Sequence, residues 1–420
     1  MYGQKKGIDL FLKRIQPRLL LAAQWSLVAA FLLFPVAFAP GNVAIALAFL
    51  LSLAAGDYRA RWQAVRGMPV VWWALGLYAV VLVGALYSPA PGADIGMHLS
   101  KYGKLLLLPA LLPLLAQAAW RTRCLNAFMA AMGFILASVY ANVFWQLPWS
   151  VTQNQGWGGD HTVVGDYITQ NIMMVFFATA AIARGQSAQG RRRWAWWLAA
   201  ALAAVAVTQL SQGRTGYLLL CVAAAGYVFL ALRGRARWVV LGSMALAIGG
   251  VLATSQTVRD RIALGLNEAA QSSSMEITSI GGRVNFWKHT ALLIEEKPLQ
   301  GWGTGSYHSV WCQRVTQEGW CWFGGWHPHN QYLFFWMENG VLGLALFLLL
   351  VSAPARASAR AAALDRPLLW AFSLIFAVDS LINSPLFSGR ESHFFIMLLL
   401  WLCAQAHFGG RGAQPTPAVV

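Results

Sequence analysis

Long apolar runs, separated by short polar stretches, make up most of the chain from residue 19 onward. Many of these runs are close to the roughly 20 residues that a helix needs to cross a bilayer. They predict about twelve transmembrane helices. Their approximate bounds are 19–38, 41–55, 69–87, 102–118, 124–146, 164–183, 195–211, 216–232, 238–255, 330–352, 367–384 and 392–408. We therefore expect an all-α polytopic membrane protein, because helices satisfy their own backbone hydrogen bonds in lipid.

One interruption of this pattern is much longer than the others. Residues 256–329 have mixed polarity and lie between the ninth and the tenth apolar run. Six tryptophans give this segment apolar surface to bury, which argues against disorder. We expect a partly helical subdomain that folds against the membrane surface. The predicted organisation is helices one to nine in 1–255, this loop subdomain in 256–329, and helices ten to twelve with a short tail in 330–420.

Composition supports the membrane assignment. The chain has 420 residues, of which 58% are hydrophobic and only 11% are charged, and its mean hydropathy is +0.53. These values exclude a soluble domain of this length. The net charge of +16 does not indicate nucleic-acid binding, because the basic residues sit in short connections between apolar runs.

The distribution of basic residues predicts the topology. Cytoplasmic loops of membrane proteins are enriched in Lys and Arg. Placing both termini in the cytoplasm assigns 21 of the 31 Lys and Arg residues to that side. The long segment 256–329 then lies on the outer face, together with the connections near residues 101, 160 and 212.

Five cysteines fit this topology. Cys124, Cys221 and Cys403 lie in or beside apolar runs, as buried core residues do. Cys312 and Cys321 share the outer loop, where an oxidising compartment would allow a disulfide. The alternative is two free thiols packed among the tryptophans.

The first candidate functional residue is Arg214, in the segment Ser211–Gly216 between two apolar runs. The connection leaves almost no room for a solvated loop, so Arg214 is expected at the outer interface. It could bind an anion there, or it could extend toward lipid headgroups, as interfacial arginines often do.

The second candidate is Arg283, in the segment from Gly281 to His289. Val284, Trp287, Ala291 and Ile294 recur at helical spacing, which predicts an amphipathic helix on the membrane that stops before Pro298. Arg283 is expected at its N-terminus, where free backbone N–H groups favour an anion. A guanidinium there would suit a phosphate group, although a surface ion pair is the alternative.

Glycines alternate from Gly301 to Gly305, immediately after this predicted helix. Such glycines would let the backbone approach a phosphate. No strand–helix unit surrounds them, so the dinucleotide fingerprint does not apply. A glycine-rich turn is the simpler interpretation.

The third candidate is His329, in the segment His327-Pro328-His329-Asn330-Gln331-Tyr332 that opens the tenth apolar run. Pro328 is expected in the first helical turn, which would place His329 at the water–lipid boundary on the same helix face as Tyr332. A neutral imidazole can act as a base there near pH 7; a capping or packing role is the alternative. Metal binding by His327 and His329 is disfavoured, because positions i and i+2 do not share a helix face.

These segments together resemble the O-antigen ligase and polymerase superfamily. The resemblance covers roughly residues 205–350 and is carried by Arg214, Gly282-Arg283 with Trp287, the stretch from Pro298 to Gly305, and His329-Asn330 followed by Leu333 and Gly340. It implies a bacterial inner-membrane enzyme with a periplasmic active site. It also implies an undecaprenyl-pyrophosphate-linked O-antigen donor and a lipid A–core oligosaccharide acceptor.

The chemistry of such a transfer assigns roles to the candidates. Charge accumulates on the leaving pyrophosphate, and fixed arginines can stabilise it, so Arg214 and Arg283 are predicted to bind the donor. The acceptor hydroxyl must lose a proton, and His329 is the predicted base. A single displacement would invert the anomeric centre. No Asp-x-Asp pair occurs, so we expect neither a metal ion nor a cofactor.

Further residues are predicted to support this site. They are Asn330, Tyr332, Trp287, His327, Lys101 and Lys104. The two lysines would contact phosphate, or would simply extend to the lipid interface.

Three alternative functions remain open. A polymerase would use the same donor and a second lipid-linked glycan as acceptor. A protein O-oligosaccharyltransferase would accept a serine. A transporter of the lipid-linked glycan would show related halves and charges at mid-membrane, and no internal repeat is visible.

Overall fold

The computed structural model describes residues 2–254, 279–315 and 319–410, with four isolated positions at 263, 266, 267 and 270. All regular structure within these ranges is helical. The helices are α1 (Tyr2–Val36), α2 (Phe38–Ala54), α3 (Tyr58–Val65), α4 (Pro69–Tyr87), α5 (Gly92–Tyr102), η1 (Gly103–Leu106), α6 (Leu107–Leu111), η2 (Leu112–Leu115), α7 (Ala118–Asn142), α8 (Tyr167–Ser187), α9 (Arg191–Gln209), α10 (Arg214–Ala231), α11 (Arg235–Thr254), α13 (Ser279–Glu296), α14 (Tyr307–Arg314), α15 (Trp320–Gly324), α16 (Gln331–Val351), α17 (Ala353–Ala357), α18 (Arg366–Ile382) and α19 (Gly389–Phe408). The predicted all-α class is confirmed for the described part of the chain.

Five of these helices are long and apolar enough to cross a membrane. They are residues Ile15–Val36 of α1, together with α4, α7, α10 and α16. A sixth span is added if α2 and α3, which meet at a bend of 117°, are counted as one broken span. The chain is therefore a multi-pass membrane protein, and the number of about twelve spans stays a prediction.

The apolar run 102–118 does not form the single helix that we predicted. It is divided into η1, α6 and η2, which follow α5 directly. Pro109 and Pro113 explain the division, because each proline removes a backbone donor and its ring crowds the preceding turn.

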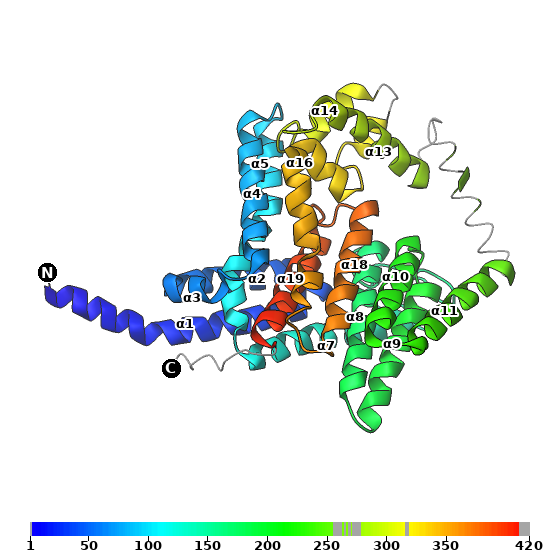
Figure 1. Ribbon diagram of the computed structural model, residues 1–420, viewed down its shortest axis with the longest axis horizontal. Coiled ribbons are helices and arrows are strands. Elements are labelled where there is room, and N and C mark those ends of the chain that lie inside the picture. The colour runs from blue at the N-terminus through cyan, green and yellow to red at the C-terminus, as the bar shows by residue number, and fades with distance from the viewer. Residues whose placement is uncertain are drawn as a thin grey trace.

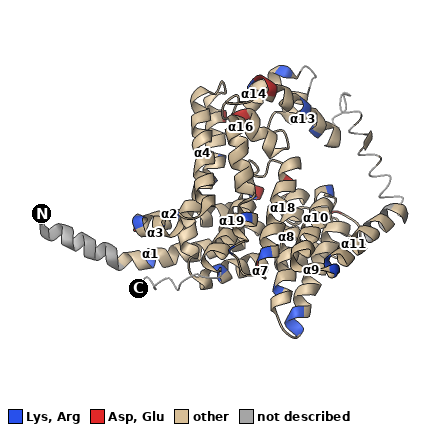
Figure 2. Cartoon of the chain, in the orientation of Figure 1, with Lys and Arg blue, Asp and Glu red and all other residues tan. Residues whose placement is uncertain are grey.

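Figure 1 shows how the helices group. The helices α4 and α5 stand beside α16, with α13 and α14 across one end of this group, while α8, α9, α10 and α11 form a second group. The helix α18 packs against both α10 and α16 and so connects the two groups. Figure 2 shows long stretches of these helices without charge, as lipid-facing and buried surfaces require.

The glycine-rich segment after α13 packs against the middle of α16. The backbone N–H groups of Trp302 and Gly303 donate to the carbonyls of Met337 and Glu338, both at 2.8 Å. These carbonyls are accessible because α16 is kinked at Gly340, where φ is 65°. A Cβ on Gly340 would lie 2.0 Å from the carbonyl oxygen of Leu299. The glycines therefore allow close packing of backbone on backbone, and the proposed approach to a phosphate is not needed to explain them.

Candidate active site

His329 lies in the short connection between α15 and α16. It has a φ of 50°, in the left-handed region that non-glycine residues seldom occupy. Its half-buried imidazole stacks on Phe286 of α13, with ring centroids 5.9 Å apart and planes 20° apart. Its Nδ1 atom is buried without a hydrogen-bond partner. A strained backbone that holds an unpaired imidazole nitrogen is typical of functional sites.

The predicted start of this helix was wrong. Pro328 is not in the first turn; α16 begins at Gln331, and Asn330 is its N-cap, with its side chain accepting from the Leu333 N–H at 3.0 Å. An Asn side chain at the N-cap satisfies a free helical amide, so the helix starts there. His329 therefore does not share a helix face with Tyr332, whose hydroxyl donates to the carbonyl of Ala377 at 3.0 Å. The roles of Asn330 and Tyr332 in this structure are capping and packing.

The two histidines are closer together than sequence spacing suggested. The ring centroids of His327 and His329 are 4.3 Å apart, because the chain between them is not helical. The His329 backbone N–H donates to Nδ1 of His327 at 3.2 Å. The argument that these side chains point apart was therefore wrong, and His327 directly supports the backbone of His329.

Helix α13 carries the second candidate. The predicted amphipathic helix exists and ends at Glu296, before Pro298. Arg283 is the fifth residue of the helix, which begins at Ser279. It therefore directly follows the first four helical amides, which have no partner within the helix, and anion binding there stays a prediction. The indole N–H of Trp287 donates to the carbonyl of Pro328 at 3.1 Å, which ties α13 to the histidine segment.

Arg283 is linked electrostatically to both other candidate residues. Burial and then the positive charge of Arg283 lower the pKa of His329 from its usual 6.5 to about 4. The Arg283 guanidinium has its own pKa lowered, mainly by burial, and the Arg214 charge contributes in the same direction. Among the residues that the structure describes, Arg283 has no hydrogen-bond partner for its guanidinium. A half-buried guanidinium without a hydrogen-bond partner, within electrostatic reach of a second cation, suits an anionic ligand.

Arg214 is the first residue of α10 and is exposed. The connection before it packs tightly on the start of α8: a Cβ on Gly213 would lie 2.5 Å from Nδ2 of Asn171 and 3.0 Å from Cδ2 of Tyr167. Asn171 also donates to the Ser211 hydroxyl at 2.8 Å. This packing fixes the position of the backbone immediately before Arg214.

Sequence reasoning missed the carboxylates next to Arg283. Asp379 of α18 and Glu391 of α19 are buried, and their negative charges favour the charged form of Arg283. Asp166, at the N-cap of α8, is bridged to Glu391 by the Thr169 hydroxyl, at 2.7 Å and 3.3 Å. The sequence signal for Asp166 is the polar run Asp166–Asn171 at the start of an apolar helix.

The two lysines behave differently from each other. Nζ of Lys101 lies 3.5 Å from the centroid of the Phe387 ring, and the His327 ring lies 5.7 Å from the same ring. The pKa of His327 is lowered well below its usual value, first by burial, then by His329 and by the charge of Lys101. Lys104 instead donates to the hydroxyl of Ser392. Lys101 therefore lies behind the histidine pair, whereas Lys104 is engaged by the start of α19.

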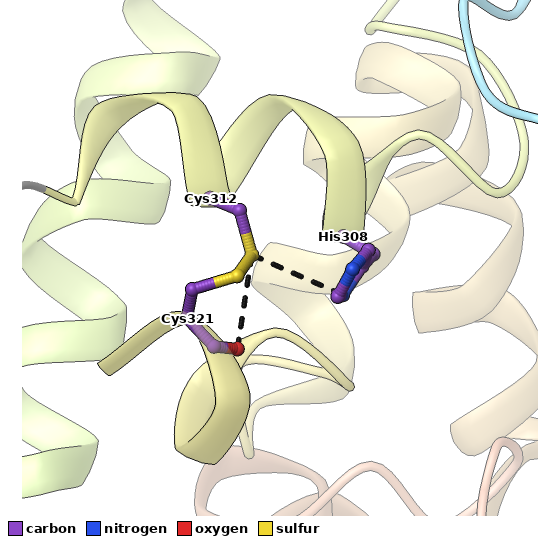
Figure 3. A group of neighbouring side chains, drawn as sticks. All are labelled: His308, Cys312 and Cys321. Carbon is purple, nitrogen blue, oxygen red and sulfur yellow. Dashed lines mark hydrogen bonds between the residues drawn. A yellow bond between two sulfur atoms is a disulfide. The ribbon is translucent and has the colours of Figure 1, made fainter. Parts of the chain in front are cut away.

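The loop subdomain contains a disulfide between Cys312 of α14 and Cys321 of α15. Figure 3 shows it beside His308, whose Nδ1 is 3.9 Å from Sγ of Cys312. These three residues form a candidate metal group among the described residues. Two of the three ligands are consumed by the disulfide, so the group has no thiolate left to bind a metal.

The disulfide holds α15 against the site. Phe286, which is only 1% exposed, has ring contacts with Trp311 of α14, with Trp320 and Phe323 of α15, and with His329. The site histidine is thus stacked on the aromatic core of this subdomain.

Comparison with known proteins points to one family. Residues 198–348 match the family described as O-antigen ligase. A curated O-antigen ligase of Salmonella typhimurium is 30% identical over 145 residues, which are 33% of this chain and 35% of that protein. The chain thus matches about a third of the length of this relative. The family match includes Arg214, Arg283 and His329.

Proposed function

We propose that this chain, whose residues 198–348 match the O-antigen ligase family, moves O-antigen from undecaprenyl pyrophosphate to a hydroxyl of lipid A–core oligosaccharide. The match supports a glycosyltransferase of the ligase or polymerase type. The donor, the acceptor, inversion at the anomeric carbon and a periplasmic location are our proposals. The disulfide between Cys312 and Cys321 supports the location, because disulfides persist in oxidising compartments.

One observation carries the proposal. The charge of Arg214 acts on Arg283, and the charge of Arg283 acts on His329, although the three residues are far apart in sequence. A neutral imidazole within reach of one cation, which is itself within reach of a second, suits a reaction in which an anionic group leaves while a hydroxyl loses a proton.

The arginines stabilise the leaving group in this mechanism. Breaking the bond between the sugar and the pyrophosphate adds negative charge to the pyrophosphate oxygens. Arg283 has an unpaired guanidinium, and Arg214 is exposed at the start of α10. Guanidinium groups bind phosphate oxygens in pairs of hydrogen bonds, so these cations can take the part that a divalent metal takes in other transferases. We propose a metal-independent reaction on that basis.

His329 takes the proton of the acceptor. The acceptor oxygen attacks the anomeric carbon, the bond from that carbon to the pyrophosphate oxygen breaks, and the hydroxyl proton moves to the imidazole. The products are the glycosylated acceptor with inverted configuration, undecaprenyl pyrophosphate and a proton. A low pKa keeps His329 neutral before the donor binds. The negative donor then offsets the charge of Arg283 and raises the pKa of His329, which makes it a stronger base.

Supporting roles follow from contacts. Trp287 and His327 hold the backbone of the histidine segment through its Pro328 carbonyl and its His329 N–H. Lys101 adds a positive charge behind His327. Lys104, bonded to Ser392, stabilises the start of α19.

The test of this function is a reconstituted transfer with purified full-length protein and the lipid-linked O-antigen in EDTA. The acceptor is either lipid A–core or a second lipid-linked glycan. A ladder on lipid A–core alone supports the ligase. Extension of the second lipid-linked glycan would instead identify a polymerase. Absence of both products, even after divalent ions are restored, would overturn the proposal.

A further inference from the structure

A cavity of about 260 Å³ lies at the opposite end of α4 and α16 from the candidate active site. Its lining includes Pro69, at the start of α4, and Ala353, which follows α16. The other end of α4 is next to the loop subdomain, because the Tyr87 hydroxyl donates to the carbonyl of Gln300. A helix rises about 1.5 Å per residue, so each of these helices separates the cavity from the active site by about 30 Å.

The lining of this cavity combines apolar residues with a few basic ones. Met68, Val70 and Ala406 are buried lining residues. The basic lining residues are Arg356, Arg360 and His407, and no acidic residue of the described ranges lines the cavity.

The two arginines of the cavity have no anionic partner. The Arg356 guanidinium lies 5.5 Å from the ring centroid of Trp73. Within the described ranges, neither Arg356 nor Arg360 makes a hydrogen bond or an ion pair through its guanidinium. Both are exposed. Two free guanidinium groups beside an apolar cavity are complementary to a molecule with an anionic head and a hydrocarbon body.

We propose that this cavity is a binding site for an anionic phospholipid. Arg356 and Arg360 hold the phosphodiester, and part of an acyl chain lies against Met68 and Val70. Basic pockets between transmembrane helices on the cytoplasmic side are suited to anionic headgroups, and the distribution of Lys and Arg predicts that this end is cytoplasmic. A soluble phosphate compound would not use the apolar walls, and the lipid-linked donor is consumed at the other membrane face.

The experiment measures lipid retained by the purified full-length protein. Native mass spectrometry compares phosphatidylglycerol with phosphatidylcholine of identical acyl chains, at equal concentration in the same detergent. The test variant is Arg356→Ala/Arg360→Ala. The matched control is Arg233→Ala/Arg235→Ala, which removes two exposed arginines, one in the connection between α10 and α11 and one at the start of α11.

We expect wild type and control to retain phosphatidylglycerol in preference to phosphatidylcholine. The test variant should bind it about ten-fold more weakly, since a basic side chain near anionic lipid contributes appreciably to binding. A second variant, Ala357→Trp, fills the cavity and keeps both arginines, and it should also lose the bound lipid. The thermal melting of each variant shows whether it is folded.

Several outcomes would overturn the proposal of a lipid site. They are equal retention of the two lipids by wild type, equal loss in test and control variants, and full retention by Ala357→Trp. If Arg356→Ala/Arg360→Ala does not fold, the Ala357→Trp result decides the question alone. Displacement of the lipid by inorganic phosphate would show that only the headgroup is recognised, which contradicts the proposed use of the apolar walls.

Discussion

The Glu338 carboxylate lies 3.1 Å from Nδ1 of His98, in a buried contact between α16 and α5. Its other oxygen accepts the backbone N–H groups of Gly305 and Tyr307, at 3.1 Å and 3.2 Å. One carboxylate thus joins α5, α16 and the start of α14. It holds the glycine-rich segment in place. Because it also holds the start of α14, it supports the aromatic core on which His329 stacks.

Replacing Glu338 tests this connection. Glu338→Ala leaves two buried amides and His98 without their acceptor, so the free energy of unfolding should fall by about 3 kcal/mol. Glu338→Gln retains an amide oxygen as an acceptor, so its free energy of unfolding should fall by less than that of Glu338→Ala. Thermal melting of the purified protein measures both. Glu295→Gln, an exposed carboxylate on α13, is the control and should melt like wild type; equal melting of all variants would contradict the connection.

Gly340 is predicted to be essential for the shape of α16. Gly340→Ala combines a positive φ with a Cβ only 2.0 Å from the Leu299 carbonyl oxygen. We expect loss of folded protein on size-exclusion chromatography. Gly133 of α7 has nothing within 4 Å of an added Cβ, so Gly133→Ala should be neutral or stabilise by up to about 1 kcal/mol. A folded Gly340→Ala variant of wild-type stability would show that the kink is dispensable.

The pKa of His329 predicts the pH dependence of the reaction. A base must be neutral, and a pKa of about 4 keeps His329 neutral well below pH 6.5. The pH profile of kcat/KM reports the ionisation of groups in the free enzyme. The midpoint of its acidic limb should therefore lie well below pH 6.5. Removing the Arg283 charge with Arg283→Gln should move this limb to higher pH, although burial still keeps it below 6.5. A limb that does not move would mean that Arg283 does not act on the base.

The same shift affects stability. Between pH 6.5 and about 4, the unfolded chain binds a proton at His329 and the folded protein does not. This contribution to stability is present above pH 6.5 and is lost as the pH falls through that range. Melting temperatures of wild type should thus fall more steeply from pH 6.5 to 4.5 than those of His329→Gln. Parallel curves would contradict the low pKa.

Arg283 and Arg214 are both predicted to bind the donor. Arg283→Ala and Arg214→Ala should each reduce kcat/KM by about 100-fold, the usual cost of losing one charge-stabilising group. Arg283→Lys keeps the charge but loses the paired hydrogen bonds, so it should retain more activity than Arg283→Ala. Lys288→Ala on the same helix is the control. Full activity of Arg283→Ala would remove Arg283 from the donor site.

The sequence predicted the elements of this site better than their geometry. Apolar periodicity located α10, α13 and α16 because each buries one face. It did not locate the start of α16, because the decision between Pro328 and Asn330 depends on a capping hydrogen bond. Nor did it reveal that the rings of His327 and His329 lie close together, with centroids 4.3 Å apart, because the positive φ of His329 is required by no local signal in the sequence.

Long-range electrostatics were beyond sequence reasoning for a different reason. Asp379 and Glu391 come from separate helices, and only the packing of α18 and α19 places them near Arg283. The glycines at 301, 303 and 305 were visible as a pattern, but their purpose was not. The pattern is equally compatible with a phosphate loop and with close backbone packing, and the contacts with α16 favour the second.

In the proposed reaction His329 is the base and works beside Arg283. The most direct measurement is the single-turnover rate of transfer to lipid A–core, with donor bound and EDTA present, for wild type, His329→Ala and His289→Ala. His289 is a half-buried histidine on α13 that contacts Trp311 and not the site. We predict that His329→Ala loses at least about 100-fold in rate while it still binds the donor, and that His289→Ala reacts like wild type. A folded His329→Ala protein with the wild-type rate would contradict the account.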